Sequence, residues 1–212
     1  MTPKLLVFAT GTPEGGGSGF ENLVNASRDG RLTAEVVGVV CNFESGGVRE
    51  KADRLGIPFI YMPGPYTAEA YLKIVSDTDA DFAALSGWLK LVKGLDPKTT
   101  FNIHPGPLPE FGGAGLYGHF VHEAVMKAYQ EGRITHSAVS MHFVTPEFDE
   151  GPVFFSHQVE IFPDDTADTL GKRVNEAEHR YQPEITNLVL NGTISWDGKE
   201  PDTLRGARRE SI

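Results

Sequence analysis

The chain has 212 residues, of which 40% are hydrophobic and 23% are charged, a composition typical of one soluble globular domain. Its formal net charge of -10 argues against broad binding of nucleic acid, and no apolar run is long enough to span a membrane. Cys41 is the only cysteine, which excludes an intrachain disulfide and favours a reducing, cytoplasmic setting. The apolar run 5–8 is too short for a signal peptide.

Short apolar runs and amphipathic segments alternate along the first half of the chain. Apolar, often valine-rich runs predict strands, and segments with apolar residues three and four apart predict helices. The expected strands are 4–10, 34–41, 58–61, 81–85 and 99–104, and the expected helices are 20–28, 47–55 and 67–75. This alternation predicts a mostly parallel, Rossmann-like α/β sheet with helices on both faces.

The second half of the chain has longer elements. A helix is expected from 118 to 130, and two β segments, 137–144 and 153–161, predict an antiparallel C-terminal extension of the sheet. Residues 163–191 are expected to be mostly helical, with Pro183 at a kink or in the first turn of a new helix.

No internal repeat or linker divides the chain, so we predict one domain, 1–198. The segment that follows, 199–212, carries three arginines and no apolar pattern. We therefore expect it to be a frayed, solvated tail.

The stretch Asn102-Ile103-His104-Pro105 lies where an apolar strand ends and a proline-rich loop begins. Residues two apart in a strand point to the same side, so Asn102 and His104 face one way together. An amide donor beside a titratable imidazole can polarise a carbonyl group and hold the resulting oxyanion. The alternative is structural, because asparagine is common before turns and a strand-end histidine is often only a hydrogen-bonded polar residue.

A glycine-rich loop, Gly15-Gly16-Gly17-Ser18-Gly19, joins the first expected strand to the first expected helix. Glycines let a backbone approach an anion closely, a helix N-terminus supplies free N–H groups, and Ser18 adds a hydroxyl donor. The loop lacks the G-x-G-x-x-G spacing of a dinucleotide site and the lysine of a P-loop. Two interpretations stay open, a phosphate site and a flexible surface loop.

Asp149 lies in the connection between the two late β segments, in a stretch closed by Gly151-Pro152. An aspartate there is often only a turn former. The functional alternative is that the loop brings a carboxylate beside His104, where it raises the pKa of the imidazole, orients it and collects a proton from an attacking amine.

The remaining histidines give weaker signals. His119 and His122 are three apart on an expected helix, but no third ligand is evident, so we predict no metal. Glu178-His179 lies on the late expected helix, and its structural interpretation is a solvated helix face. Three further histidines are expected at edge or exposed strand positions: His136, His142 and His157.

The three motifs occur in one order: the glycine-rich loop, Asn-x-His-Pro, then His-Phe-Val followed by Asp-x-Gly-Pro. That order resembles the folate-dependent formyltransferases, closest to the branch that formylates glycinamide ribonucleotide in purine synthesis, over 5–196. Four other stretches resemble one bacterial branch of that family: Phe111-Gly112-Gly113, Tyr117-Gly118, Val121-His122-Glu123-Ala124 and Pro163-Asp164-Asp165-Thr166.

The resemblance implies formyl transfer from 10-formyltetrahydrofolate, a co-substrate, to the amine of glycinamide ribonucleotide, with no metal. It implies a phosphate-binding half, 1–100, and a catalytic and folate half, 101–198. The implied catalytic residues are Asn102, His104 and Asp149. The implied phosphate and ribose contacts are Gly15, Gly16, Gly17, Ser18, Gly19 and Glu178. The implied folate contacts are Trp88, Leu89, Lys90, Leu91, Val92, Val144, Thr145, Glu147 and Phe148.

The chain departs from the family pattern around the phosphate. Gly16 and Gly19 stand where the family usually has asparagines, and Thr12-Pro13-Glu14 looks like an insertion. Lys90 stands where arginine is common, and Asn175 where lysine or glutamine is common.

These departures keep a second acceptor open, the amine of an amino-sugar nucleotide. A non-catalytic nucleotide-binding domain is the alternative from another class. We expect small-molecule partners, no nucleic acid and no membrane, and either a monomer or a homodimer.

Overall fold

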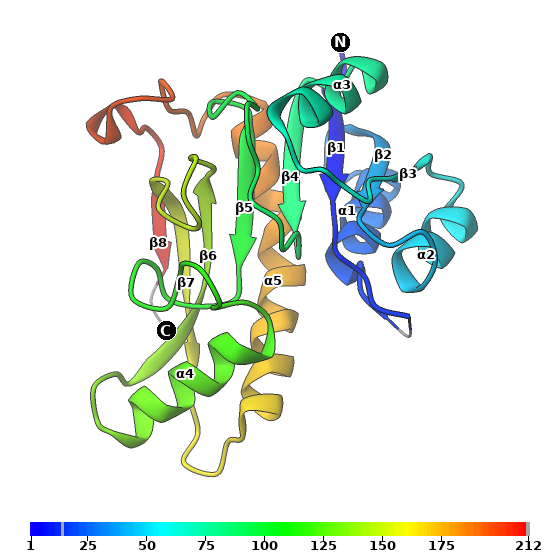
Figure 1. The fold of residues 1–212 in the computed structure, drawn as a ribbon. Helices are drawn as coiled ribbons and strands as arrows, with labels where there is room; N and C mark the ends of the chain where they lie inside the picture. The colour runs from blue at the N-terminus through cyan, green and yellow to red at the C-terminus, as the bar shows by residue number, and fades with distance from the viewer. Residues whose placement is uncertain (14, 211–212) are drawn as a thin grey trace.

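A computed structural model of the chain describes residues 1–13 and 15–210. Its centre is an eight-stranded sheet with the order β3-β2-β1-β4-β5-β6-β7-β8 (Figure 1). The strands are β1 Lys4–Phe8, β2 Glu35–Cys41, β3 Phe59–Tyr61, β4 Phe82–Ser86, β5 Thr100–His104, β6 His136–Phe143, β7 Val153–Glu160 and β8 Arg208–Glu210. The helices are α1 Ser18–Asp29, α2 Gly47–Leu55, α3 Ala68–Thr78, α4 His119–Gln130 and α5 Ala167–Leu190.

The expected Rossmann-like sheet with an antiparallel extension is confirmed. Strands β1 to β5 pair in parallel, β6 runs antiparallel to both β5 and β7, and β8 pairs in parallel with β7. Alternate residues of β1 enter two cores, Leu5 and Val7 on one face and Leu6 and Phe8 on the other. The first core is covered by α1, α2, α4 and α5, and the second contains Tyr71 of α3.

We expected either a kink or the first turn of a new helix at Pro183. Helix α5 continues through Pro183 to Leu190, so the second of these expectations is wrong. A proline inside a helix leaves the carbonyl four residues earlier without its N–H partner. That carbonyl belongs to His179, and it accepts a hydrogen bond of 2.9 Å from Asn22 Nδ2 of α1. The carbonyl that Pro183 leaves free is therefore satisfied from α1, and this hydrogen bond joins α5 to α1.

The tail is the other difference. Pro201–Thr203 forms a 3-10 turn, and Arg208–Glu210 forms β8 on the edge of the sheet, so the expectation of a frayed tail is wrong for this part. Pairing with β7 is a long-range contact that the tail's composition does not reveal. Residues 211 and 212 of the expected tail, and Glu14 of the expected insertion, lie outside the described residues.

The direction of the central strands locates the site. Figure 1 shows that β1, β4 and β5 end at the same edge of the sheet. The chain turns away from β1 towards β2 and later returns to β4 on its other side, which makes a switch point at that edge. Ligands of open α/β sheets bind outside such a point.

Candidate active site

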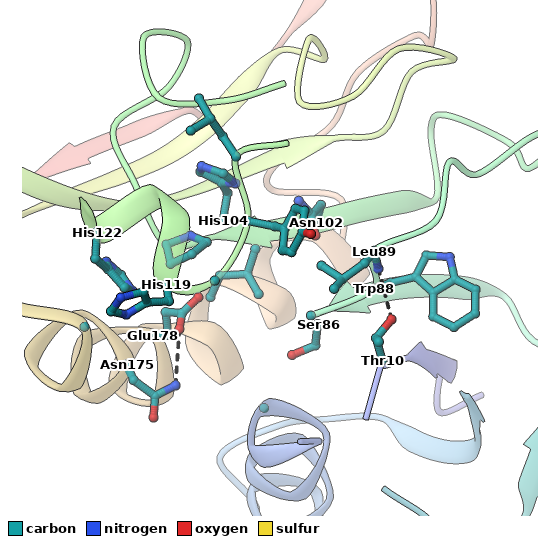
Figure 2. A pocket seen from close by; sticks show the side chains of 18 of the residues that line it. Thr10, Ser86, Trp88, Leu89, Asn102, His104, His119, His122, Asn175 and Glu178 are labelled. Atoms are coloured by element: carbon teal, nitrogen blue, oxygen red, sulfur yellow. Dashed lines mark hydrogen bonds between the residues drawn. The ribbon is translucent and has the colours of Figure 1, made fainter. Parts of the chain in front are cut away.

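Two adjoining cavities lie at this edge of the sheet. The larger, about 780 Å³, is lined by the loop after β1, the ends of β4 and β5, and the facing sides of α4 and α5 (Figure 2). The smaller, about 40 Å³, lies towards the segments after β4 and β6. Four residues line both cavities: Trp88, Asn102, Phe148 and Asp149.

The three predicted catalytic side chains meet where the cavities join. Asn102 and His104 come from the end of β5, and Asp149 comes from the loop between β6 and β7. Asn102 Nδ2 donates to Asp149 Oδ1 over 3.3 Å, and His104 Nδ1 lies 3.7 Å from Asp149 Oδ2. His104 Nε2 donates to the carbonyl of Phe111 over 2.8 Å. The nitrogen that faces Asp149 is therefore Nδ1.

The backbone around Asp149 is fixed by glycines. Asp149 has a φ of 57°, and its Oδ2 accepts a 3.0 Å hydrogen bond from the N–H of Gly113. A Cβ at Gly151 would overlap the carbonyl oxygen of Phe143. The Gly151-Pro152 turn can therefore fold back tightly onto β6, which sets the position of the carboxylate.

His142 is a member of this cluster that the sequence analysis missed. We expected it at an edge or exposed position, whereas it is buried and lies opposite Asn102 in the pairing of β5 with β6. Its Nε2 is 3.1 Å from Asn102 Nδ2 and 3.3 Å from Asp149 Oδ1. Its Nδ1 donates to the carbonyl of Phe143 over 2.8 Å. Only the register between the two strands reveals this neighbour.

The pKa of His104 also differs from the expectation. Burial lowers it below the ordinary value of 6.5, and this outweighs the opposing effect of the Asp149 charge. Burial alone would raise the pKa of Asp149, but the hydrogen bond with His142, the charge of His104 and the Gly113 N–H together lower it. The arrangement favours a neutral imidazole beside an ionised carboxylate near neutral pH.

The glycine-rich loop reaches the larger cavity with four of its five predicted residues, namely Gly16, Gly17, Ser18 and Gly19. Gly17 caps α1 with a φ of 74°, and no side chain caps the first turn, which leaves it open to an anion. Gly15 differs, because its N–H donates to the Thr12 carbonyl at 3.3 Å and it packs against Gly47 of α2 instead of lining the cavity.

Helix α5 supplies the opposite wall. Glu178 lines the larger cavity, and Asn175 Nδ2 donates to its Oε2 over 3.3 Å, as Figure 2 shows. Burial raises the pKa of Glu178 to about 7. Glu178 therefore does not lie on a solvated helix face, which was the structural alternative for this residue, and its carboxyl group is a poorly hydrated acceptor for ligand hydroxyls.

The predicted folate contacts gather around the smaller cavity. Eight of the nine line it, and the ninth, Leu89, lines the larger one. The segment after β4 is anchored from both sides: Trp88 Nε1 donates to Tyr71 Oη over 3.1 Å, and the Leu89 N–H donates to Thr10 Oγ1 over 3.1 Å. Lys90 Nζ lies 5.5 Å from the centre of the Tyr66 ring.

His122 also lines the larger cavity, where burial lowers its pKa to about 4. His119, beside it, contacts Glu123 and Asp168 at 3.3 Å and 3.2 Å. Among residues 1–13 and 15–210, no group of three or more His, Cys, Asp or Glu is placed to hold a metal ion. Within the same residues, no helix is long and apolar enough to cross a membrane.

Comparison with known proteins identifies the family. The formyl transferase family matches residues 4–186, which is most of the chain. The chain belongs to the formyl transferase family. Among its relatives, a chloroplastic phosphoribosylglycinamide formyltransferase of Arabidopsis thaliana is 33% identical over 204 residues, covering 91% of this chain and 67% of the relative.

Bacterial formyl transferases resemble the chain over a larger share of their own length. A phosphoribosylglycinamide formyltransferase of Bacillus subtilis is 27% identical, with 88% of this chain and 94% of the relative covered. The crystal structure of glycinamide ribonucleotide transformylase 1 from Symbiobacterium toebii superposes with a TM-score of 0.80 at 26% identity, covering 96% of this chain and 93% of that one. The family and the fold are thus established independently of each other.

Proposed function

We propose that the chain transfers the formyl group of 10-formyltetrahydrofolate to the primary amine of glycinamide ribonucleotide, and that it does so in the cytoplasm. The single observation that carries this proposal is the meeting of Asn102, His104 and Asp149 between two cavities. Folate lies on the smaller cavity's side, and the ribonucleotide fills the larger cavity, with its phosphate at Gly16 to Gly19 and its ribose at Glu178. The relatives named above support this choice of substrates.

The amine nitrogen attacks the formyl carbon, a C–N bond forms, and the carbonyl electron pair moves to oxygen. Asn102 Nδ2, which contacts Asp149 Oδ1 and His142 Nε2, donates a hydrogen bond to that oxyanion once one of these two contacts is released. The nitrogen releases a proton towards Asp149 and the Nδ1 face of His104, which lie 3.7 Å apart. The intermediate then breaks its bond to N10 of folate, and N10 takes up a proton.

The burial of this cluster supports the mechanism. His104 and His142 are almost fully buried, and Asp149 is largely so. In such a site, donors that are already in place stabilise a developing charge more than they would in water. A neutral His104 with a lowered pKa is also ready to accept a proton at neutral pH.

A second acceptor class keeps specific support, because Gly16 and Gly19 bring no amide side chain to the phosphate. The test is a formyl-transfer assay in which glycinamide ribonucleotide, an amino-sugar nucleotide and no acceptor are compared. We expect kcat/KM for glycinamide ribonucleotide to be highest, with little hydrolysis of the folate in the absence of acceptor. A higher kcat/KM for the amino-sugar nucleotide would show that the amino-sugar nucleotide is the acceptor, and the formyl-transfer mechanism would be unchanged.

A further inference from the structure

Two buried polar side chains pair beneath the first turn of α1. Gln182 of α5 donates through Nε2 to Ser86 Oγ at the end of β4, over 3.0 Å. Their exposed fractions are 2% and 8%, and both line the larger cavity. Figure 2 shows the Ser86 hydroxyl turned into the space between its strand and Asn175 and Glu178 of α5.

This pair has hydrogen-bonding capacity that the protein does not use. Among the described residues, Gln182 Oε1 is buried and has no partner. A buried polar atom left in this way costs about 1–3 kcal/mol unless something else satisfies it. The hydroxyl of Ser86 both donates and accepts, and a carboxamide presents an oxygen at one end and an NH2 group at the other. Together they can offer a ligand both a donor and an acceptor.

The glycine at position 19 makes room for the pair. A Cβ there would overlap Ser86 Oγ and lie 3.3 Å from Gln182 Oε1. Gly19 belongs to the first turn of α1, where the open N–H groups favour an anion. The loop has no side-chain amide at this position, and polar groups from β4 and α5 occupy the space beside it.

Position along α5 connects the pair to the rest of the site. Asn175, Glu178 and Gln182 are three and four residues apart, so they form one stripe on the helix surface. All three line the larger cavity. A ligand whose sugar contacts Glu178 thus has Gln182 one turn further along, next to the first turn of α1.

We propose that Ser86 and Gln182 bind the ribose 5-phosphate portion of the acceptor and help to determine which acceptor is used, an inference that rests on the proposed function. Ser86 donates to a phosphate or ester oxygen, and Gln182 Oε1 accepts from a sugar hydroxyl. A purely structural tie between β4 and α5 is the competing explanation. It predicts a change in stability without a selective change in acceptor binding.

The first experiment measures KM for both substrates in Gln182→Met and Ser86→Ala. The matched control is Thr186→Val, which alters another buried side chain with an unpaired oxygen one turn along α5, outside the cavity. We expect each test variant to raise KM for the ribonucleotide about 10-fold, as for the loss of one hydrogen bond to a ligand, and to leave KM for the folate within about 2-fold. The control should change neither.

The second experiment keeps the inference separate from the catalytic proposal. Ribose 5-phosphate should raise the melting temperature of the wild type and of Thr186→Val, but much less that of Gln182→Met. If glycinamide ribonucleotide is no substrate and this pattern still holds, the proposed function fails while the binding pair stands. Equal shifts in all three proteins, no shift in the wild type, or an equal rise in both KM values would overturn the inference.

Discussion

Asp149 is the residue whose charge the proposed chemistry needs most directly. Asp149→Asn keeps the size of the side chain and an oxygen for the Gly113 N–H, but it cannot take a proton from the amine. We expect kcat to fall about 100-fold or more, the usual contribution of a general base, with little change in melting temperature. Steady-state kinetics test this, with Asp164→Asn as the control, because Asp164 is an exposed carboxylate outside both cavities. A kcat near the wild-type value would remove Asp149 from the mechanism.

Glu178 should make the stability of the protein depend on pH. Its pKa is about 7 when folded against 4.5 for the ordinary side chain, so the folded state holds a proton that the unfolded state has lost between these values. The corresponding stability is present below about pH 4.5 and is lost as the pH rises through about 7.

Glu178→Gln removes this titration. At pH 8.5 we expect the variant to gain about 1–3 kcal/mol relative to the wild type, since one pKa unit is worth ~1.4 kcal/mol and partial exposure reduces the effect. At pH 5 the gain should be much smaller. Denaturant unfolding at both pH values tests this, with the exposed Glu176→Gln as control. A gain that is the same at both values contradicts the proposed burial of the charge.

At the scale of elements, the contact between α1 and β4 makes a prediction about stability. Gly19→Ala would force its Cβ onto Ser86 Oγ and should cost about 1–3 kcal/mol, as overpacked cores do. In Ser86→Ala the nearest atom of residue 86 is its Cβ, 3.4 Å from the added methyl group, which is an ordinary contact. The double variant should therefore lose less stability than the sum of the two single variants, as measured by a double-mutant cycle in urea. Additive losses would mean that the backbone relaxes instead.

Local chemistry made some elements predictable from sequence. Helix α2 has the bounds expected for 47–55, because Gly56 adopts a left-handed φ of 64° that ends a helix. The pairing of Asn102 with His104 follows from the two-residue period of a strand, and both line the larger cavity as expected. These inferences need no knowledge of which segments meet.

Long-range partners account for what the sequence analysis missed. His142 joins the cluster because β6 pairs with β5 in one register, and a shift of one residue would turn it to the other face. Gly15 leaves the cavity because its N–H bonds to Thr12 beside Gly47 of α2. Helix α5 continues through Pro183, and Asn22 of α1 donates to the His179 carbonyl that the proline leaves without a partner. Each outcome depends on a neighbour distant in sequence or on a local turn that composition does not specify.

At the scale of the whole molecule, β8 forms one edge of the eight-stranded sheet. It pairs with β7 through Phe155 to His157, and Glu210 Oε2 lies 3.4 Å from His157 Nδ1. The exposed Arg208 and Arg209 place positive charges on this edge, which discourages pairing with another chain. Within the sheet, β7 separates this strand from β6, whose His142 lines the smaller cavity.

Removal of residues 207–212 should therefore separate stability from activity. We expect a loss of about 1–2 kcal/mol, or ~2–8 °C in melting temperature for a chain of this size, because the β7 edge loses its hydrogen-bond partner. The uncovered edge should also promote self-association that increases with protein concentration, while kcat/KM at low protein concentration stays within about 2-fold of the wild type. Calorimetry, light scattering over a concentration series and the formyl-transfer assay measure the three quantities.

Arg208→Ala/Arg209→Ala serves as the comparison, because it removes the charges but keeps the strand. If the truncated protein keeps its melting temperature and loses activity instead, β8 acts on the site and not on the sheet edge.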